Sequence, residues 1–251
     1  MEKCGKFVDK KLLLSQSLSR IMAGLLPQIN ELYHLHPCAP GNLKQDGTPV
    51  TSLDLALSVL IENMSAKDYP DTTIYSEENY SLWDFPLMAI DPLDGTREYI
   101  LNRPEWAVSI GHFLSEKFEG EGWVYNPATQ ELFNEATSVN EIKKHKYEGE
   151  VSHSEWNNGL YKKLKNDKFL LTPRGSIAYK LGRLSSGKID FVVSLTPKNI
   201  WDIAGGSLLC QKGGYKFYSD GKEVTKVKQC YQPPLIWCRE GLFSELSKLF
   251  P

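Results

Sequence analysis

Apolar residues recur every three or four positions in two N-terminal segments of the chain. The first segment extends from Leu14 to Tyr33 and the second from Leu53 to Met64. Because this spacing places apolar side chains on one face of a helix, it predicts two amphipathic helices. Asp54 lies in the first turn of the second helix, where the helix dipole favours an acid.

Shorter apolar runs between turn-forming residues predict β-strands after the second helix. The predicted strands cover residues 73–76, 85–90, 107–114, 121–125 and 131–133. From about Ser138 to Asp167 the chain is polar with weak periodicity, as expected of a junction between domains. We therefore expect an N-terminal α+β part over residues 1–138 and a C-terminal α/β part over residues 139–251.

Helical and extended patterns alternate in the C-terminal part. Residues 176–184 and 202–211 are predicted helices, and residues 189–194 and 215–218 are predicted strands. Each helix is followed by glycine, which often ends helices because it adopts the left-handed conformation. Such alternation is typical of packed layers of helices and sheet.

Composition limits the partners of the chain. Its 251 residues include 29 Lys and Arg against 31 Asp and Glu, for a net charge of −2. This balance gives no general basic field for a nucleic-acid polymer or an anionic membrane, so we expect any phosphate affinity to be local. Polar residues interrupt the first apolar segment, which predicts neither a signal peptide nor a membrane span. The five scattered cysteines form no C-x-x-C pair and predict reduced thiols in a cytoplasmic protein.

The stretch IDPLDGTREY, residues 90–99, follows an apolar run and carries two aspartates around a proline. Proline favours extended geometry in the residue before it, so Asp91 should project from the end of the strand. Leu93 then offers a carbonyl, Asp94 a second carboxylate, and Gly95 and Thr96 the start of a helix. Such oxygen ligands suit Mg²⁺ and a helix N-terminus suits phosphate. A simple Asp-capped turn is the structural alternative.

Further acids stand at the ends of other predicted elements. Asp54 and Asp202 begin helices, and Glu77-Glu78 ends a strand. Taken singly, the aspartates are explained as acids favoured by the helix dipole, and the glutamates as a solvated pair. Taken with residues 91–96, they predict one metal and phosphate site.

Four segments resemble, in order and spacing, the motifs of the inositol monophosphatase superfamily of magnesium-dependent, lithium-sensitive phosphatases. They are GTPVTSLD (47–54), SEE (76–78), DPLDGTREYI (91–100) and NIWDIAGG (199–206). The motif sequences are most similar to those of the 3'(2'),5'-bisphosphate nucleotidases of the CysQ type. The resemblance implies a layered α/β/α/β sandwich of the sugar-phosphatase type.

The same resemblance implies the roles of the site residues. The ligands of two or more Mg²⁺ ions would be Glu77, Asp91, the Leu93 carbonyl, Asp94 and Asp202. Together with Glu77, Asp54 and Thr96 would be catalytic, and these two would hold or activate the attacking water. The N–H groups of Gly95 and Thr96 would hold the phosphate. Two residues separate Asp91 from Asp94, unlike the D-x-D-G-T pattern of haloacid dehalogenases, so no covalent phosphoenzyme is expected.

Departures from the family pattern fall on the substrate side. The glycine-rich G-x-G-A-x-x-N-G hairpin is missing after residues 122–133, and residues 194–197 (SLTP) replace an acid that contacts the sugar ring in inositol monophosphatases. RGSIAYK (174–180) resembles a substrate-contacting segment. Besides Leu93, Asp94, Gly95, Thr96 and Asp202, the expected substrate contacts are therefore Gly175, Ser176 and Lys180. A lysine on a helix face is more often solvated, and His153 is either near a base ring or incidental.

The expected function is hydrolysis of a small phosphorylated metabolite by a monomer or homodimer. The favoured reaction converts 3'-phosphoadenosine 5'-phosphate to AMP and phosphate by direct attack of metal-activated water. An inositol-phosphate or other sugar-phosphate phosphatase is the enzymatic alternative. A metal-dependent phosphate-binding regulator is the alternative without catalysis.

Overall fold

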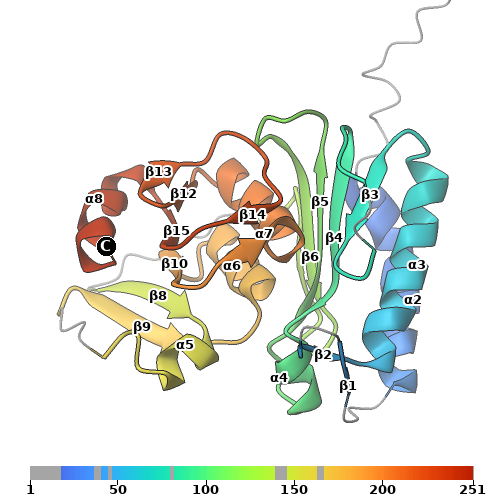
Figure 1. Ribbon diagram of the computed structural model, residues 1–251, viewed down its shortest axis with the longest axis horizontal. Coiled ribbons are helices and arrows are strands. Elements are labelled where there is room, and N and C mark those ends of the chain that lie inside the picture. Colours follow the sequence, from blue (N-terminus) through green and yellow to red (C-terminus); the bar gives the residue numbers. More distant parts are fainter. Residues whose placement is uncertain are drawn as a thin grey trace, which may run out of the picture.

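Helices and sheets alternate in layers in this protein (Figure 1). The computed structural model describes residues 18–36, 41–44, 47–79, 82–138, 146–162 and 167–250. Helices α2 (Leu18–Leu35) and α3 (Ser52–Asp68) cover the outer face of a five-stranded sheet. Helices α6 (Ile177–Ser185) and α7 (Ile200–Lys212) lie between this sheet and a six-stranded sheet. The predicted α/β/α/β sandwich is confirmed, and helix α8 (Glu240–Leu249) covers the far side of the second sheet.

The first sheet has the strand order β3-β4-β5-β6-β7. Its strands are β3 (Thr73–Ser76), β4 (Leu87–Asp94), β5 (Ala107–Phe113), β6 (Gly120–Asn126) and β7 (Glu131–Phe133). Strand β3 runs parallel to β4, and the other pairs are antiparallel. Along β4, Leu87 and Ala89 face α7, whereas Met88 and Ile90 face α2 and α3. Both faces of the strand are covered, which explains its continuous apolar run.

The second sheet has the strand order β13-β12-β15-β10-β8-β9. Its strands are β8 (Tyr147–Val151), β9 (Phe169–Pro173), β10 (Phe191–Ser194), β12 (Lys216–Ser219), β13 (Lys222–Glu223) and β15 (Leu235–Cys238). Strand β8 lies parallel to both of its neighbours, β10 and β9. The polar stretch 138–167 is therefore more than a junction, because it contributes β8 and the short helix α5 (His153–Asn157). The division after residue 138 stays a prediction, and residues 139–145 lie outside the described part.

Small residues allow α7 to approach the first sheet closely. A Cβ atom added to Gly205 would lie 2.7 Å from the Trp123 carbonyl oxygen and 2.8 Å from that of Ile110. On the sheet, a Cβ atom added to Gly111 would lie 2.5 Å from the Ala204 Cβ. Real Cβ atoms do not make such contacts, so the glycines set the distance between helix and sheet. This distance fixes how far the N-terminus of α7, with Asp202, stands from β4.

Most predicted elements are present, with shifted boundaries. The first predicted helix corresponds to α2, although residues 14–17 lie outside the described part. The strand predicted over residues 85–90 is found as β4, which extends to Asp94. Strand β15 and helix α8 were not predicted. Five short elements complete the chain: β1 (Asn42–Leu43), β2 (Pro49–Val50), α4 (Thr96–Ile100), β11 (Lys198–Asn199) and β14 (Cys230–Tyr231).

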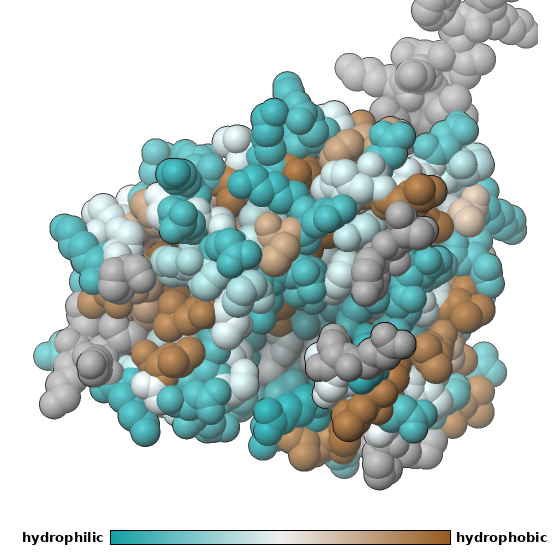
Figure 2. Space-filling view, in the orientation of Figure 1, coloured by the Kyte–Doolittle hydropathy of each residue, from teal (hydrophilic) through white to brown (hydrophobic). Residues whose placement is uncertain are grey.

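The surface is mixed, with apolar side chains gathered in limited areas. Figure 2 shows one such area at the right, along the outer helices, and α3 exposes Leu55 and Val59. Among the described helices, none has both the length and the apolar character needed to cross a membrane.

Candidate active site

Glu77 and Asp91 leave the first sheet side by side. Ser76 pairs with Ile90 in the parallel β3–β4 register, and the Glu77 N–H donates to the Ile90 carbonyl at 3.1 Å. The residues that follow these two positions therefore reach the same edge of the sheet, as parallel strands require. The parallel pairing, which the sequence patterns leave open, is what brings the two acids together.

Asp94 returns to this edge after an irregularity in β4. The β4–β5 register shifts between Asp91 and Asp94, and the Leu93 N–H donates to Asp91 Oδ1 at 3.0 Å. Asp94 Oδ2 accepts hydrogen bonds from Ser176 Oγ at 2.5 Å and from the Ala178 N–H at 2.7 Å. Asp94 is thus held by the start of α6, which leaves its other oxygen uncommitted by these bonds.

Asp202 joins the two aspartates from the first turn of α7. The Asn199 N–H donates to Asp202 Oδ2 at 2.8 Å, which orients the carboxylate at the helix start. One carboxylate oxygen from each of Asp91, Asp94 and Asp202 lies within 4.8 Å of the other two. Three chain segments therefore bring acids to one point.

Glu77 has a different partner from the three aspartates. Lys44 Nζ lies 2.7 Å from Glu77 Oε1 and 2.6 Å from Glu78 Oε1. The interpretation of Glu77-Glu78 as a solvated pair is therefore wrong. Burial raises the pKa of Glu77, although Lys44 acts in the opposite direction.

The clustered carboxylates are electrostatically costly without a cation. Burial raises the pKa of Asp91 well above its ordinary value, and the charges of Glu77 and Asp94 raise it further. Burial, followed by the charge of Asp94, raises the pKa of Asp202 to about 7. Like charges at close range favour protonation or a bound cation. Oxygen-only ligands fit Mg²⁺, a hard cation, so the residues present are consistent with a magnesium site.

Asp54 and Thr96 form a hydrogen-bonded pair beside this cluster. Thr96 Oγ1 donates to Asp54 Oδ1 at 2.9 Å and lies 3.2 Å from the Leu93 carbonyl oxygen. The N–H and hydroxyl of Thr51, the N-cap of α3, donate to the other oxygen of Asp54 at 2.8 and 2.5 Å. Burial raises the pKa of Asp54 despite these hydrogen bonds. The pair predicted from sequence is therefore in contact.

Gly95 and Ser176 bring the turn after β4 and the start of α6 next to each other. Gly95, at φ +97°, is the N-cap of α4, and an added Cβ would lie 3.3 Å from the Ser176 Cβ. Ser176 has a positive φ of 50°, which is unusual for a residue with a side chain. Its hydroxyl caps α6 by accepting from the Tyr179 N–H and donates to Asp94. These bonds hold a strained residue at the site.

Lys180 is buried and lines the cavity, so the alternative that it is simply solvated is wrong, and its role as a substrate contact stays a prediction. Its side chain is 2% exposed, and Nζ donates to the carbonyls of Arg174 and Gly175 at 2.9 and 3.4 Å. Burial lowers the pKa of Lys180 to about 8. The Gly175 N–H is also engaged, because it donates to Glu105 Oε2 at 2.9 Å. Lys180 therefore supports the 174–175 loop as well as lining the site.

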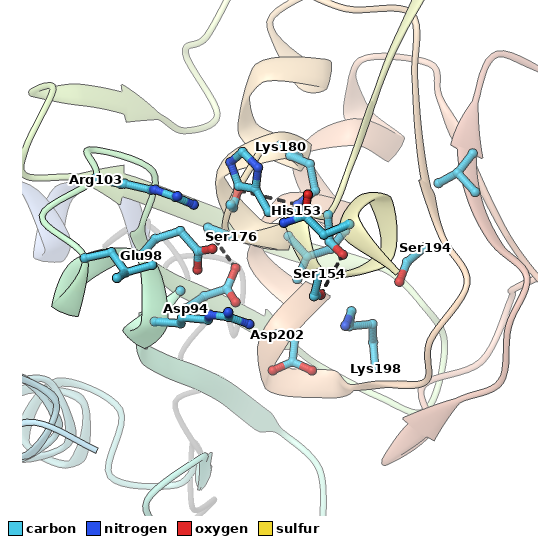
Figure 3. A pocket seen from close by; sticks show the side chains of 18 residues that line it. Asp94, Glu98, Arg103, His153, Ser154, Ser176, Lys180, Ser194, Lys198 and Asp202 are labelled. Carbon is cyan, nitrogen blue, oxygen red and sulfur yellow. Dashed lines mark hydrogen bonds between the residues drawn. The ribbon is translucent and has the colours of Figure 1, made fainter. Parts of the chain in front are cut away.

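A cavity of ≈ 300 Å³ opens beside Asp94 and Asp202, and Figure 3 shows the side chains around it. Sequence reasoning missed four charged residues of its lining, Arg97, Glu98, Arg103 and Lys198. In the part of the chain that the structure describes, neither Arg97 nor Arg103 has an acidic partner within salt-bridge distance. Arg97 and Glu98 belong to the 91–100 motif quoted above. The resemblance assigned roles only to residues 91–96 of that motif, so these two side chains were overlooked.

Helix α5 forms another wall of the cavity. His153 lines it and lies 2.6 Å, through Nε2, from Glu105 Oε2. Glu155 is 1% exposed and accepts from Ser194 Oγ at 2.9 Å, the Leu195 N–H at 2.9 Å and Thr196 Oγ1 at 2.7 Å. This carboxylate joins α5 to the loop that leads to Lys198. The wall comes from a segment whose sequence gave no periodic signal.

Comparison with known proteins agrees with this geometry. A model of the inositol monophosphatase family matches residues 39–237. Inositol monophosphatase 3 of Solanum lycopersicum is 29% identical over 205 residues, 69% of this chain and 75% of that protein. The Nus factor SuhB of Pasteurella multocida is 29% identical over 237 residues, 82% of this chain and 88% of that protein.

The fold is also similar to a solved structure. The Thermotoga maritima IMPase has a TM-score of 0.76 at 21% sequence identity, covering 92% of this chain and 96% of its own. The family match spans most of the chain and includes all the acids of the site. The chain belongs to the inositol monophosphatase family.

Proposed function

We propose that this protein is a magnesium-dependent phosphomonoester hydrolase, and that its preferred substrate is 3'-phosphoadenosine 5'-phosphate, which it converts to AMP. The observation that carries the hydrolase proposal is the approach of Asp91, Asp94 and Asp202 to within 4.8 Å beside the Asp54–Thr96 pair. A structural role alone does not require a partly buried acid cluster next to a hydrogen-bonded hydroxyl and carboxylate.

The metal would be held by the oxygens of Asp91, Asp94 and Asp202, with Glu77 and the Leu93 carbonyl completing the ligands of two or more ions. When bound, Mg²⁺ would supply Lewis-acid chemistry, neutralising phosphoryl charge and making water a stronger acid. A structure of similar fold, with a TM-score of 0.74 at 14% identity, is described as an IMPase/NADP phosphatase complexed with Mg²⁺ and phosphate. That precedent supports the same ion here.

Asp54 and Thr96 would orient the attacking water and accept its proton. Thr96 Oγ1 donates to Asp54 Oδ1, so its oxygen lone pairs are free to accept a hydrogen bond from water on the other side. Burial raises the pKa of Asp54, which makes its carboxylate a better proton acceptor than an exposed aspartate. The pair therefore has the geometry and the basicity needed to orient water and receive its proton.

The charges of the cavity favour a substrate with a second phosphate. Arg97, Arg103 and Lys198 line the same cavity as Asp94 and Asp202. The two arginines have no acidic partner among the described residues, so their donors are available to an anion. A bisphosphorylated nucleotide offers one phosphate to the acid cluster and its metal, and the other to these cations.

An inositol-phosphate or other sugar-phosphate phosphatase is the second candidate. The names of the plant and Thermotoga maritima relatives favour it. Against it, the lining of the cavity between Ser194 and Asp202 contributes Lys198 rather than a carboxylate to bind ring hydroxyls. A phosphate-binding regulator is a weaker candidate, because both members of the Asp54–Thr96 pair are retained and in contact.

The test measures phosphate release with saturating Mg²⁺ from 3'-phosphoadenosine 5'-phosphate, 3'-AMP and inositol 1-phosphate. We expect the highest kcat/KM for the bisphosphate. A higher kcat/KM for inositol 1-phosphate would favour the second candidate. Binding of all three substrates without phosphate release would favour the regulator.

A further inference from the structure

Glu98 presents a buried carboxylate to the cavity, and no other residue in the described part of the chain donates a hydrogen bond to it. The residue is 9% exposed and lies in α4, between the N-cap Gly95 and Arg103. Among the residues that the structure describes, only its own backbone N–H is hydrogen-bonded to its carboxylate. Figure 3 shows this carboxylate pointing toward the Ser176–Asp94 hydrogen bond, at the acid end of the cavity.

The surroundings of Glu98 hold the carboxylate in place. An added Cβ at Gly175 would lie 2.2 Å from Glu98 Cγ, so the glutamate stem packs directly on the Gly175 backbone. The Lys180 ammonium donates to the carbonyls of Arg174 and Gly175 instead, and no ion pair joins Glu98 to Arg97 or Arg103 in the described part of the chain. The acceptor oxygens of Glu98 are therefore left for a ligand. A buried carboxylate without a partner is costly, which makes a complementary donor strongly favoured.

The chemistry of that donor follows from charge and position. A phosphate group does not match Glu98 itself, because the two carry like charge and Glu98 is not among the acids proposed to hold the metal. The matching group is a hydroxyl or amino N–H. Since the reacting phosphate lies at the acid cluster, the part of the substrate nearest to Glu98 is the carbon frame that carries the ester oxygen.

We propose that Glu98 accepts a hydrogen bond from a hydroxyl on the carbon next to the phosphorylated carbon, and so selects phosphate esters of vicinal diols. The inference rests on the proposed function and adds the feature of the substrate that is recognised. In a ribonucleoside 3'-phosphate this group is the 2'-hydroxyl. A 2'-deoxy substrate would leave the Glu98 carboxylate buried and unpaired, and a hydrogen bond to a charged group typically changes affinity by about tenfold to a hundredfold.

The test compares 3'-phosphoadenosine 5'-phosphate with its 2'-deoxy analogue. In the wild type we expect kcat/KM to be higher for the ribose substrate by about tenfold or more. In Glu98→Ala the ratio should fall to within about twofold of one, and Glu98→Gln, which keeps one acceptor, should give an intermediate ratio. Glu116→Ala is the matched control, because Glu116 is exposed and pairs with Lys226 away from the cavity.

A second readout does not depend on turnover. Calorimetric binding of the product 5'-AMP and of its 2'-deoxy form, which differ at the carbon next to the one that carried the 3'-phosphate, should show the same preference in the wild type and the same loss in Glu98→Ala. If the wild type does not discriminate, or if Glu98→Ala weakens both substrates equally, Glu98 is only a structural neighbour of Lys180 and the proposal is wrong. If Glu98→Ala does not fold, the ratio of kcat/KM between ribose and 2'-deoxy substrates in the wild type and in Glu98→Gln tests the proposal instead. Absence of phosphate release from every substrate, including p-nitrophenyl phosphate, would instead refute the proposed function.

Discussion

Replacing Gly205 by alanine tests whether the fit of α7 on the first sheet positions the proposed metal site. The new Cβ would lie 2.7 Å from the Trp123 carbonyl oxygen and 2.8 Å from the Ile110 carbonyl oxygen, both backbone atoms. These backbone atoms belong to paired strands and cannot move aside as a flexible side chain would. Helix α7 must therefore move away from the sheet by several tenths of an ångström. Asp202 lies one helical turn before Gly205 and moves with the helix.

Two opposing terms set the size of the effect. Alanine gains about 1 kcal/mol over glycine from helix propensity. Overpacking a well-packed interface costs about 1–3 kcal/mol per site, and here the contacts are with backbone on two strands. Because both contacts are with backbone, we take the upper end of this cost, which leaves a net loss of about 2 kcal/mol in the free energy of unfolding. The Mg²⁺ concentration for half-maximal activity should rise, because Asp202 is displaced from Asp91 and Asp94.

Urea unfolding in EDTA gives the stability change, and Mg²⁺ titration of phosphate release gives the effect on the site. Gly24→Ala is the matched control, since Gly24 lies in α2 with nothing within 4 Å of an added Cβ. That variant should gain up to about 1 kcal/mol and keep the wild-type Mg²⁺ requirement. If Gly205→Ala unfolds like the wild type and needs no more Mg²⁺, the close fit of α7 does not position Asp202.

Three further predictions concern charge. Asp91→Asn should abolish turnover yet leave the metal-free protein as stable as the wild type or more stable, because it removes one of several repelling acids; near-normal rates at saturating Mg²⁺ would exclude Asp91 as a ligand. In EDTA, the raised pKa of Asp202 means that the folded state binds more protons than the unfolded state between its usual 3.8 and about 7. This residue's contribution to stability should therefore fall as pH rises through that window, and urea unfolding should show a smaller fall for Asp202→Asn than for the wild type. Arg103→Ala should lower kcat/KM for 3'-phosphoadenosine 5'-phosphate about tenfold but hardly change that for 3'-AMP; an equal loss on both substrates, or the same loss in the exposed control Arg20→Ala, would count against a second-phosphate contact.

The elements that carry the acids were predictable because local rules act on them. Pro92 favours an extended Asp91, and Thr51 with Asp54 forms a capping box at the start of α3. The glycines after α6 and α7 mark their ends. Motif spacing and family resemblance then identified the same acids that the fold brings together.

Long-range pairing was not predictable from the same patterns. The parallel β3–β4 register places Glu77 beside Asp91, but no residue in either strand specifies its partner strand. Strand β8 was missed because its residues Tyr147 to Val151 include charged and glycine positions, although it lies inside the second sheet. With β8 unrecognised, the α5 wall could not be predicted, and the sequence left open whether His153 lies near a base ring or is incidental.

Burial reversed two sequence interpretations of charged residues. Lys180 occurs at a helix position where lysine is usually solvated. Its ammonium is instead buried, because it donates hydrogen bonds to the carbonyls of Arg174 and Gly175. Glu77 and Glu78 look like an exposed acidic pair, but Lys44, more than thirty residues earlier, binds both. Such pairings depend on loops whose positions follow from tertiary structure, so propensity alone does not reveal them.

Magnesium titration of phosphate release from 3'-phosphoadenosine 5'-phosphate tests the central claim most directly. The measurement follows the initial rate from zero Mg²⁺ in EDTA to saturation, at a fixed substrate concentration. Because Asp91, Asp94 and Asp202 would hold the ion that neutralises the phosphoryl charge, we predict no turnover in EDTA and a saturable rise with Mg²⁺. Full turnover in EDTA, or no phosphate release at any Mg²⁺ concentration, would contradict the account.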